Sequence, residues 1–129
     1  MHNLFISHSW NHGVQYDKLI SLLDSYPYFA YKNYSVPKND PIHNAANDRE
    51  LEEAIRSQMK YASCVLILAG VYATYSKWIN IEIRLAKELK KKIIAVAPFG
   101  AEHTSLTVRN AADEIVRWNS QSIVSAIRD

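Results

Sequence analysis

Residues 63–69, SCVLILA, are the most apolar stretch of the chain and decide its expected fold. A short apolar run of this length is typical of a strand that is buried on both faces of a sheet. Residues 93–97, IIAVA, have the same character. Between the two runs, residues 77–91 carry apolar side chains at helical spacing, which predicts a helix. A strand, a helix and a second strand in this order predict a parallel βαβ unit.

The same alternation continues toward both ends of the chain. The further expected elements are strands over 3–7, 29–36 and 114–118, a helix over 14–25, a helix that follows Asp48 and includes Met59, a loop or short helix over 102–112, and a closing helix to 128. Asp48 and Ser76 are predicted helix caps, and Asn119 or Ser120 is predicted to cap the closing helix. We therefore expect a single α/β domain over residues 1–129, a flavodoxin-like three-layer sandwich with a mostly parallel five-stranded sheet.

The composition argues against several classes of function. Fifteen Lys and Arg residues against thirteen Asp and Glu residues leave a net charge of +2, which is too balanced to predict nucleic-acid binding. No apolar run approaches the roughly 18 residues of a membrane span, and we expect no membrane partner. Three glycines cannot form a Walker loop or a G-x-G-x-x-G turn. The lone Cys64 is expected in the core of a cytoplasmic protein, without a nucleophilic role.

Functional residues of open α/β sheets gather beyond the carboxyl ends of the strands. In this chain those ends are residues 8–13, 35–47, 70–76 and 98–103. His8 and His12 fall in the first segment, but a loop holds them and no Cys or carboxylate lies at useful spacing. We therefore expect no metal site.

Glu82 is the most informative residue of the sequence. Its neighbours at helical spacing are all apolar: Trp78, Ile79, Leu85, Ala86 and Leu89. The opposite helix face carries Lys77, Asn80, Arg84, Lys87 and Lys91. Glu82 should therefore face the sheet, where a bare carboxylate costs several kcal/mol. Three interpretations remain open: a carboxylate in a functional cleft, a structural ion pair with Arg56 or Arg109, or a helix that is rotated further than the pattern assumes.

Two motifs resemble a Toll/interleukin-1 receptor (TIR) domain: Phe5-Ile6-Ser7-His8-Ser9, and Ser76, Trp78 and Glu82 at the spacing of a Ser-x-Trp-x-x-x-Glu helix start. Three further segments are similar to the short bacterial branch that includes the Thoeris antiphage proteins: residues 33–37, 69–72 and 118–127. The similarity spans essentially the whole chain.

The resemblance implies an NAD+ glycohydrolase or ADP-ribosyl cyclase-like enzyme with NAD+ as substrate and no bound cofactor. Its product would be a cyclic or conjugated ADP-ribose signal, read by a nucleotide-sensing effector, and activation would involve self-association. Glu82 would be the catalytic carboxylate. The implied substrate contacts are Ser7, His8, Ser9, Trp10, Ser35, Asp48, Gly70, Ser76 and Trp78. Among these, helix capping suits Ser76 better than ligand binding, and packing suits Trp78 better.

Two other functions compete with this one. A TIR-like module without catalysis would only bind partners and transmit a signal. A response-regulator receiver needs an acidic pair after the first strand and an Asp after the third, and Ser7, His8 and Gly70 stand there instead. The receiver is therefore set aside, whereas the non-catalytic module stays open.

Overall fold

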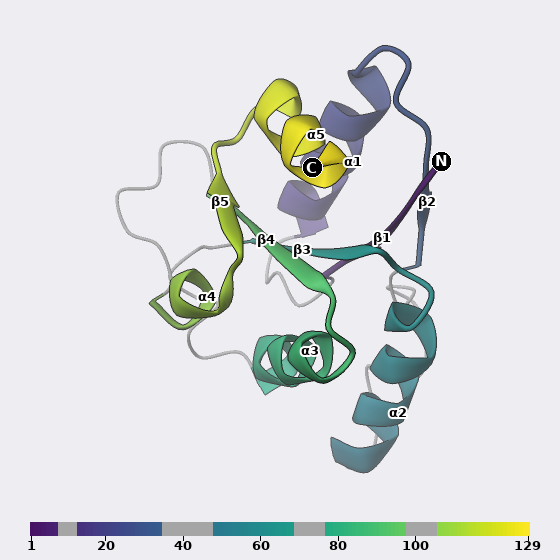
Figure 1. The fold of residues 1–129 in the computed structure, drawn as a ribbon, viewed down its shortest axis with the longest axis vertical. Helices are drawn as coiled ribbons and strands as arrows, with labels where there is room; N and C mark the ends of the chain where they lie inside the picture. The colour runs from purple at the N-terminus through teal and green to yellow at the C-terminus, as the bar shows by residue number, and fades with distance from the viewer. Residues whose placement is uncertain (8–12, 35–47, 69–76, 98–105) are drawn as a thin grey trace.

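A computed structural model describes residues 1–7, 13–34, 48–68, 77–97 and 106–129 of the chain (Figure 1). In these ranges the strands are β1 (His2–Ile6), β2 (Tyr31–Asn33), β3 (Cys64–Leu68), β4 (Lys92–Val96) and β5 (Glu114–Val116). The helices are α1 (Gly13–Ser25), α2 (Asp48–Met59), α3 (Lys77–Glu88), α4 (Leu106–Ala111) and α5 (Ser120–Arg128). All described strands pair in parallel in the order β2-β1-β3-β4-β5, which is the flavodoxin-like order.

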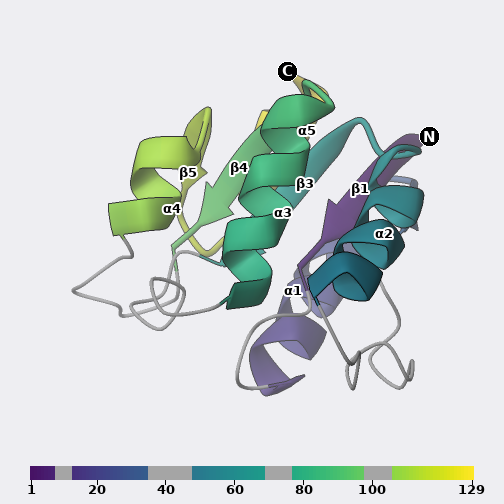
Figure 2. The same cartoon turned by 90° about the horizontal axis from the view of Figure 1, so that it is seen from below.

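The sheet is covered on both faces, as the three-layer prediction requires. Helices α1 and α5 lie on one face, and α2, α3 and α4 lie on the other (Figures 1 and 2). Each face has its own apolar core, one containing Leu19 and Ile123 and the other containing Ile55 and Leu85. None of the helices in the described ranges is long and apolar enough to cross a membrane.

The central strand β3 explains why SCVLILA is apolar without interruption. Cys64 and Leu66 pack into the core under α1 and α5, whereas Val65 and Ile67 pack into the core under α2 and α3. Successive side chains of a strand point to opposite faces. A strand between two covered faces therefore needs apolar residues at every position.

Several strand boundaries shift by one or two residues from the prediction, and the differences are larger at β2 and at the end of α3. Strand β2 covers Tyr31–Asn33 rather than 29–36, of which 35–36 lie outside the described residues, and α3 ends at Glu88 rather than at Lys91. The helix stops because Lys90 adopts a left-handed conformation, with φ of 57°. The Lys91 N–H then donates to the Ala86 carbonyl at 2.8 Å, and the Lys90 N–H donates to the Lys87 carbonyl at 3.1 Å. This is a Schellman ending with lysine where glycine is usual.

Asn119, the first of the two predicted residues, caps the closing helix α5. The Asn119 side-chain oxygen accepts a hydrogen bond of 2.7 Å from the Ser122 N–H, and α5 begins at Ser120. Asp48 is the first residue of α2. Ser76, the cap predicted for α3, lies outside the described residues.

Candidate active site

The candidate site joins the carboxyl end of β1 to the second turn of α3. Ser7 directly follows β1, and its N–H donates to the Leu66 carbonyl of β3 at 3.0 Å. The Ser7 hydroxyl donates to Oε1 of Glu82 at 2.6 Å. Both residues are completely buried, with exposed fractions of 0%. The contact therefore brings together two side chains that are 75 residues apart in the sequence.

The amphipathic pattern of α3 places Glu82 on the sheet side. Ile79 and Leu85, three residues away in each direction, are buried in the core against β3 and β4. Asn80 and Arg84 on the other face are exposed. The predicted orientation of the helix is thus confirmed, and Glu82 lies in the middle of an apolar surface.

The hydrogen bond between Ser7 and Glu82 has the length of a charge-assisted contact. Hydroxyl groups that donate to an ionised carboxylate typically lie 2.5–2.7 Å from it, against about 2.7–2.8 Å for neutral pairs. A buried carboxylate needs such donors, because desolvation of an ion without them costs several kcal/mol. Ser7 thus supplies part of the stabilisation that permits a carboxylate at this depth.

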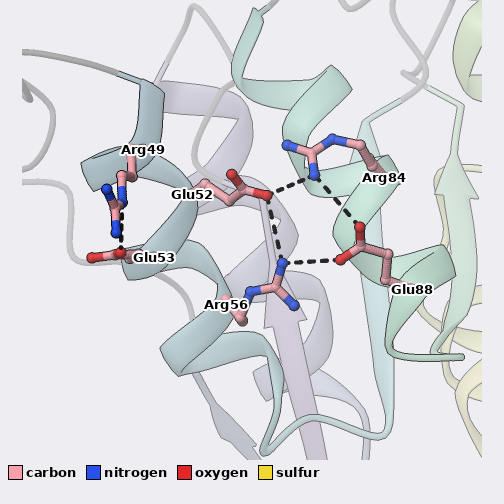
Figure 3. Close-up of polar contacts among 6 residues, drawn as sticks. All are labelled: Arg49, Glu52, Glu53, Arg56, Arg84 and Glu88. Carbon is pink, nitrogen blue, oxygen red and sulfur yellow. Dashed lines mark hydrogen bonds and ion pairs between the residues drawn. The ribbon is translucent and has the colours of Figure 1, made fainter.

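The alternative of an ion pair to Arg56 or Arg109 is wrong. Arg56 pairs with Glu88 at 2.9 Å and with Glu52 at 3.5 Å, in a network between α2 and α3 (Figure 3). Arg109 is exposed on α4. Within the described part of the chain, neither guanidinium contacts Glu82.

The remaining predicted site residues are only partly covered by the described ranges. Asp48 begins α2, and Trp78 lies in the first turn of α3. The predicted contacts that fall outside the described residues are His8, Ser9, Trp10, Ser35, Gly70 and Ser76. Their part in the site stays a prediction, as does a direct contact between Ser7 and substrate.

The thiol of Cys64 has no role at this site. Cys64 is 2% exposed, and burial raises the pKa of its thiol to about 11 despite the nearby charge of Lys92. A thiol in this environment is a poor nucleophile at neutral pH. The prediction of a core cysteine is confirmed.

Comparison with known proteins decides the family. The family model described as "Thoeris protein ThsB, TIR-like domain" matches residues 5–103, which include both Ser7 and Glu82. The chain belongs to this family. No curated protein matches the sequence of this TIR-like domain.

Two solved structures share the fold of the TIR-like domain. One is the CMP N-glycosidase BcmB of Clostridium botulinum, with a TM-score of 0.59, 16% identity, and coverage of 98% of both chains. The other is a prokaryotic SEFIR domain, with a TM-score of 0.60, 13% identity, and coverage of 99% of this chain and 97% of that one. At these identities the comparisons establish the fold, and function must be argued from the site.

Proposed function

We propose that this TIR-like domain cleaves NAD+ at the bond between nicotinamide and ribose and produces a cyclic or conjugated ADP-ribose signal in antiphage defence. The observation that carries the proposal is the fully buried Glu82, held by Ser7 where β1 meets α3. This is the sheet edge at which doubly wound folds bind ligands. A module that only binds partners has no need of a carboxylate at this depth, since an apolar residue there costs less.

The main contribution that this reaction requires from the protein is a negative charge near the ribose. Nicotinamide leaves NAD+ as a neutral molecule, because the electron pair of the C1′–N bond neutralises the pyridinium cation. No general acid is therefore required. The ribose left behind has oxocarbenium character, and a nearby carboxylate stabilises that positive charge. Water or a nucleophile of a second group then bonds to C1′ and loses a proton, which gives ADP-ribose or its cyclic or conjugated form.

Ser7 would act on this step through Glu82. A hydroxyl bonded to Oε1 at 2.6 Å fixes the orientation of the carboxylate before the substrate arrives. Charge stabilisation is strongest when the stabilising group does not have to reorient during the reaction. In this proposal Glu82 is the catalytic carboxylate and Ser7 is a positioning residue.

The comparisons support the class of reaction by analogy. The family is named for a Thoeris protein, and one structure of the same fold is named as a CMP N-glycosidase. Such an enzyme cleaves a bond from a ribose C1′ to nitrogen, as in the reaction proposed here. By the same analogy we propose NAD+ as a substrate rather than a resident cofactor, self-association on activation, and a nucleotide-sensing effector as the recipient of the signal.

The decisive experiment incubates the purified protein with NAD+, with and without phage-infected lysate, and analyses the nucleotides by mass spectrometry. Glu82→Gln keeps the size of the side chain and removes its charge. Glu53→Gln is the matched control, because Glu53 is exposed on α2 and pairs with Arg49 at 3.4 Å. We expect loss of NAD+ and a new ADP-ribose species with the native protein and the control, and neither with Glu82→Gln.

The same experiment distinguishes the competing function. If NAD+ stays intact at high protein concentration and in the presence of infected lysate, the domain is a non-catalytic interaction module. Glu82 would then have a structural role, and partner capture would replace the nucleotide assay.

A further inference from the structure

We infer that a cleft at the end of α3 binds the phosphate groups of a polyphosphate. The cleft has a volume of about 500 Å³ and lies between the last turn of α3, the start of β4 and the residue before β5. Its lining residues are Lys87, Lys90, Lys91, Lys92 and Asp113. This site is separate from the proposed active site, because it lies at the amino end of β4, whereas Ser7 follows the carboxyl end of β1 in the same parallel sheet.

The lysines of the cleft carry charge that the protein itself does not neutralise. In the described part of the chain, Lys87, Lys90 and Lys91 form no ion pair, although the Lys91 ammonium donates a hydrogen bond to the Lys60 carbonyl at 3.2 Å. Lys92 does form one, with Glu114 at 3.2 Å, and its ammonium also donates to the Ala126 carbonyl at 2.8 Å. The cleft is therefore lined by three lysines that no carboxylate of the described ranges pairs with, in a protein whose net charge is only +2.

The position of these lysines at the end of a helix explains the presence of some of them but not of all. The negative pole of the helix dipole favours one or two cations in the last turn. Lys90, however, lies one residue beyond the helix cap in the left-handed region, with φ of 57°. Glycine adopts that conformation at lower cost and would end the helix equally well. A lysine at this position thus adds charge to the cleft at the expense of backbone stability.

Asp113 lines the cleft in a position that hydrogen bonds to the backbone of β4 hold fixed. Its N–H donates to the Ile93 carbonyl at 2.9 Å, and its Oδ2 accepts from the Ile93 N–H at 2.8 Å. The carboxylate is therefore tied to the backbone of β4 rather than to a lysine. Its charge opposes anions, so a ligand needs several phosphates in order to gain more from the lysines than it loses to Asp113.

The ligand chemistry that follows is a chain of two or more phosphates. Lysine binds phosphate as a compact point charge without bidentate geometry, which suits linked phosphates of variable conformation. A free inorganic polyphosphate and a nucleoside triphosphate share this chemistry. Titration calorimetry of the full chain with tripolyphosphate and, separately, with ATP distinguishes the two sources.

The first variant is chosen so that weaker binding cannot be explained by a less stable protein. Lys90→Gly removes one cation but relieves the left-handed lysine, so the variant is expected to be at least as stable as the native protein. Lys91→Gln removes a second cation from the cleft. Lys18→Gln is the control, because Lys18 is exposed on α1, which covers the other face of the sheet. Asp113→Asn removes the negative charge and keeps an oxygen acceptor.

We expect saturable binding of tripolyphosphate at low ionic strength that weakens as salt is added. Lys90→Gly and Lys91→Gln should each weaken it about three- to fivefold, and Asp113→Asn should strengthen it by a similar factor. Lys18→Gln should leave it unchanged. Absence of binding at millimolar ligand overturns the inference. So does an equal effect of Lys18→Gln, since binding would then follow net charge rather than the cleft.

Discussion

Ser7 and Glu82 are the buried polar and charged residues of the described ranges, in an interior that is otherwise apolar. Because the environment is dry, the hydrogen bond between them is stronger than a comparable bond at the surface. The same environment makes its loss expensive, since no water replaces the donor. The pair therefore matters for both stability and the proposed reaction.

Ser7→Ala tests both roles of this hydrogen bond. Loss of a hydrogen bond to a buried charged group is expected to lower the free energy of unfolding by about 2 kcal/mol, measured by urea denaturation. If the proposed function holds, kcat for NAD+ cleavage should also fall by roughly ten- to a hundredfold with little change in KM.

The controls separate positioning from simple destabilisation. Ser7→Thr keeps the hydroxyl and should recover part of kcat, even though its extra methyl group strains a buried position. Ser125→Ala removes an exposed hydroxyl on α5 and should change neither quantity. An unchanged unfolding free energy for Ser7→Ala would show that the hydrogen bond contributes nothing in solution.

At the scale of elements, α2 and α3 are joined by a four-membered charge network. Arg84 and Arg56 each pair with both Glu52 and Glu88, at distances from 2.6 to 3.6 Å (Figure 3). The hydrogen bond from Arg84 is the main cause that lowers the pKa of Glu52 below its ordinary value. The nearby ion pair of Arg49 with Glu53 lies within α2 and joins no other helix.

Arg84→Gln should lower the melting temperature at neutral pH and low salt, measured by circular dichroism. A lowered pKa means that the stabilisation is present above the ordinary pKa of Glu52, 4.5, and is lost as the pH falls through the folded-state value. The difference from the native protein should therefore shrink in acid and in high salt. Arg49→Gln should have no measurable effect at any pH, because isolated exposed pairs contribute little. Equal effects of the two variants would contradict a special role for the network.

Most elements could be predicted from sequence because their causes are local. The apolar run of β3 and the periodicity of α3 are visible without any tertiary information. The end of α3 was missed because no glycine marks it, and lysine adopts the left-handed conformation at Lys90 only when the turn into β4 requires it. The edge strand β2 was overestimated because, within the described residues, Tyr31–Asn33 pair with the first three residues of β1, and no local pattern indicates where that pairing ends.

Of the two features that define the site, the burial of Glu82 could be predicted from the sequence and its contact with Ser7 could not. The burial of Glu82 follows from its apolar neighbours on α3, which the sequence displays. Its contact with Ser7 depends on β1 lying beside β3, with α3 packed across the sheet. The two residues are 75 positions apart, and the sequence around each one gives no indication that it contacts the other.

At the scale of the whole molecule, β3 lies between β1 and β4 with both faces covered, so Cys64 becomes accessible only when the fold opens. Burial raises the pKa of its thiol from 9.0 to about 11. Between these two values the unfolded chain ionises its thiol, whereas the folded protein keeps it neutral. Rising pH therefore favours unfolding over this interval.

The free energy of unfolding should fall between about pH 9 and pH 11 by at most about 2 to 3 kcal/mol through this thiol alone. Denaturation of the native protein and of Cys64→Ala across this range measures the contribution as the difference in slope. Other groups titrate there too, but they do so in both proteins. Identical slopes would show that the thiol is not the cause.

The distance in sequence between Ser7 and Glu82 has a consequence for synthesis. A nascent chain that has completed β1, β2 and β3 presents the serine but not yet the helix that carries the carboxylate. The pair forms only after α3 has emerged and has β4 to pack against. If the proposed reaction is correct, incomplete or proteolysed chains that lack this half cannot consume NAD+, so translation itself delays the activity until the sheet is assembled.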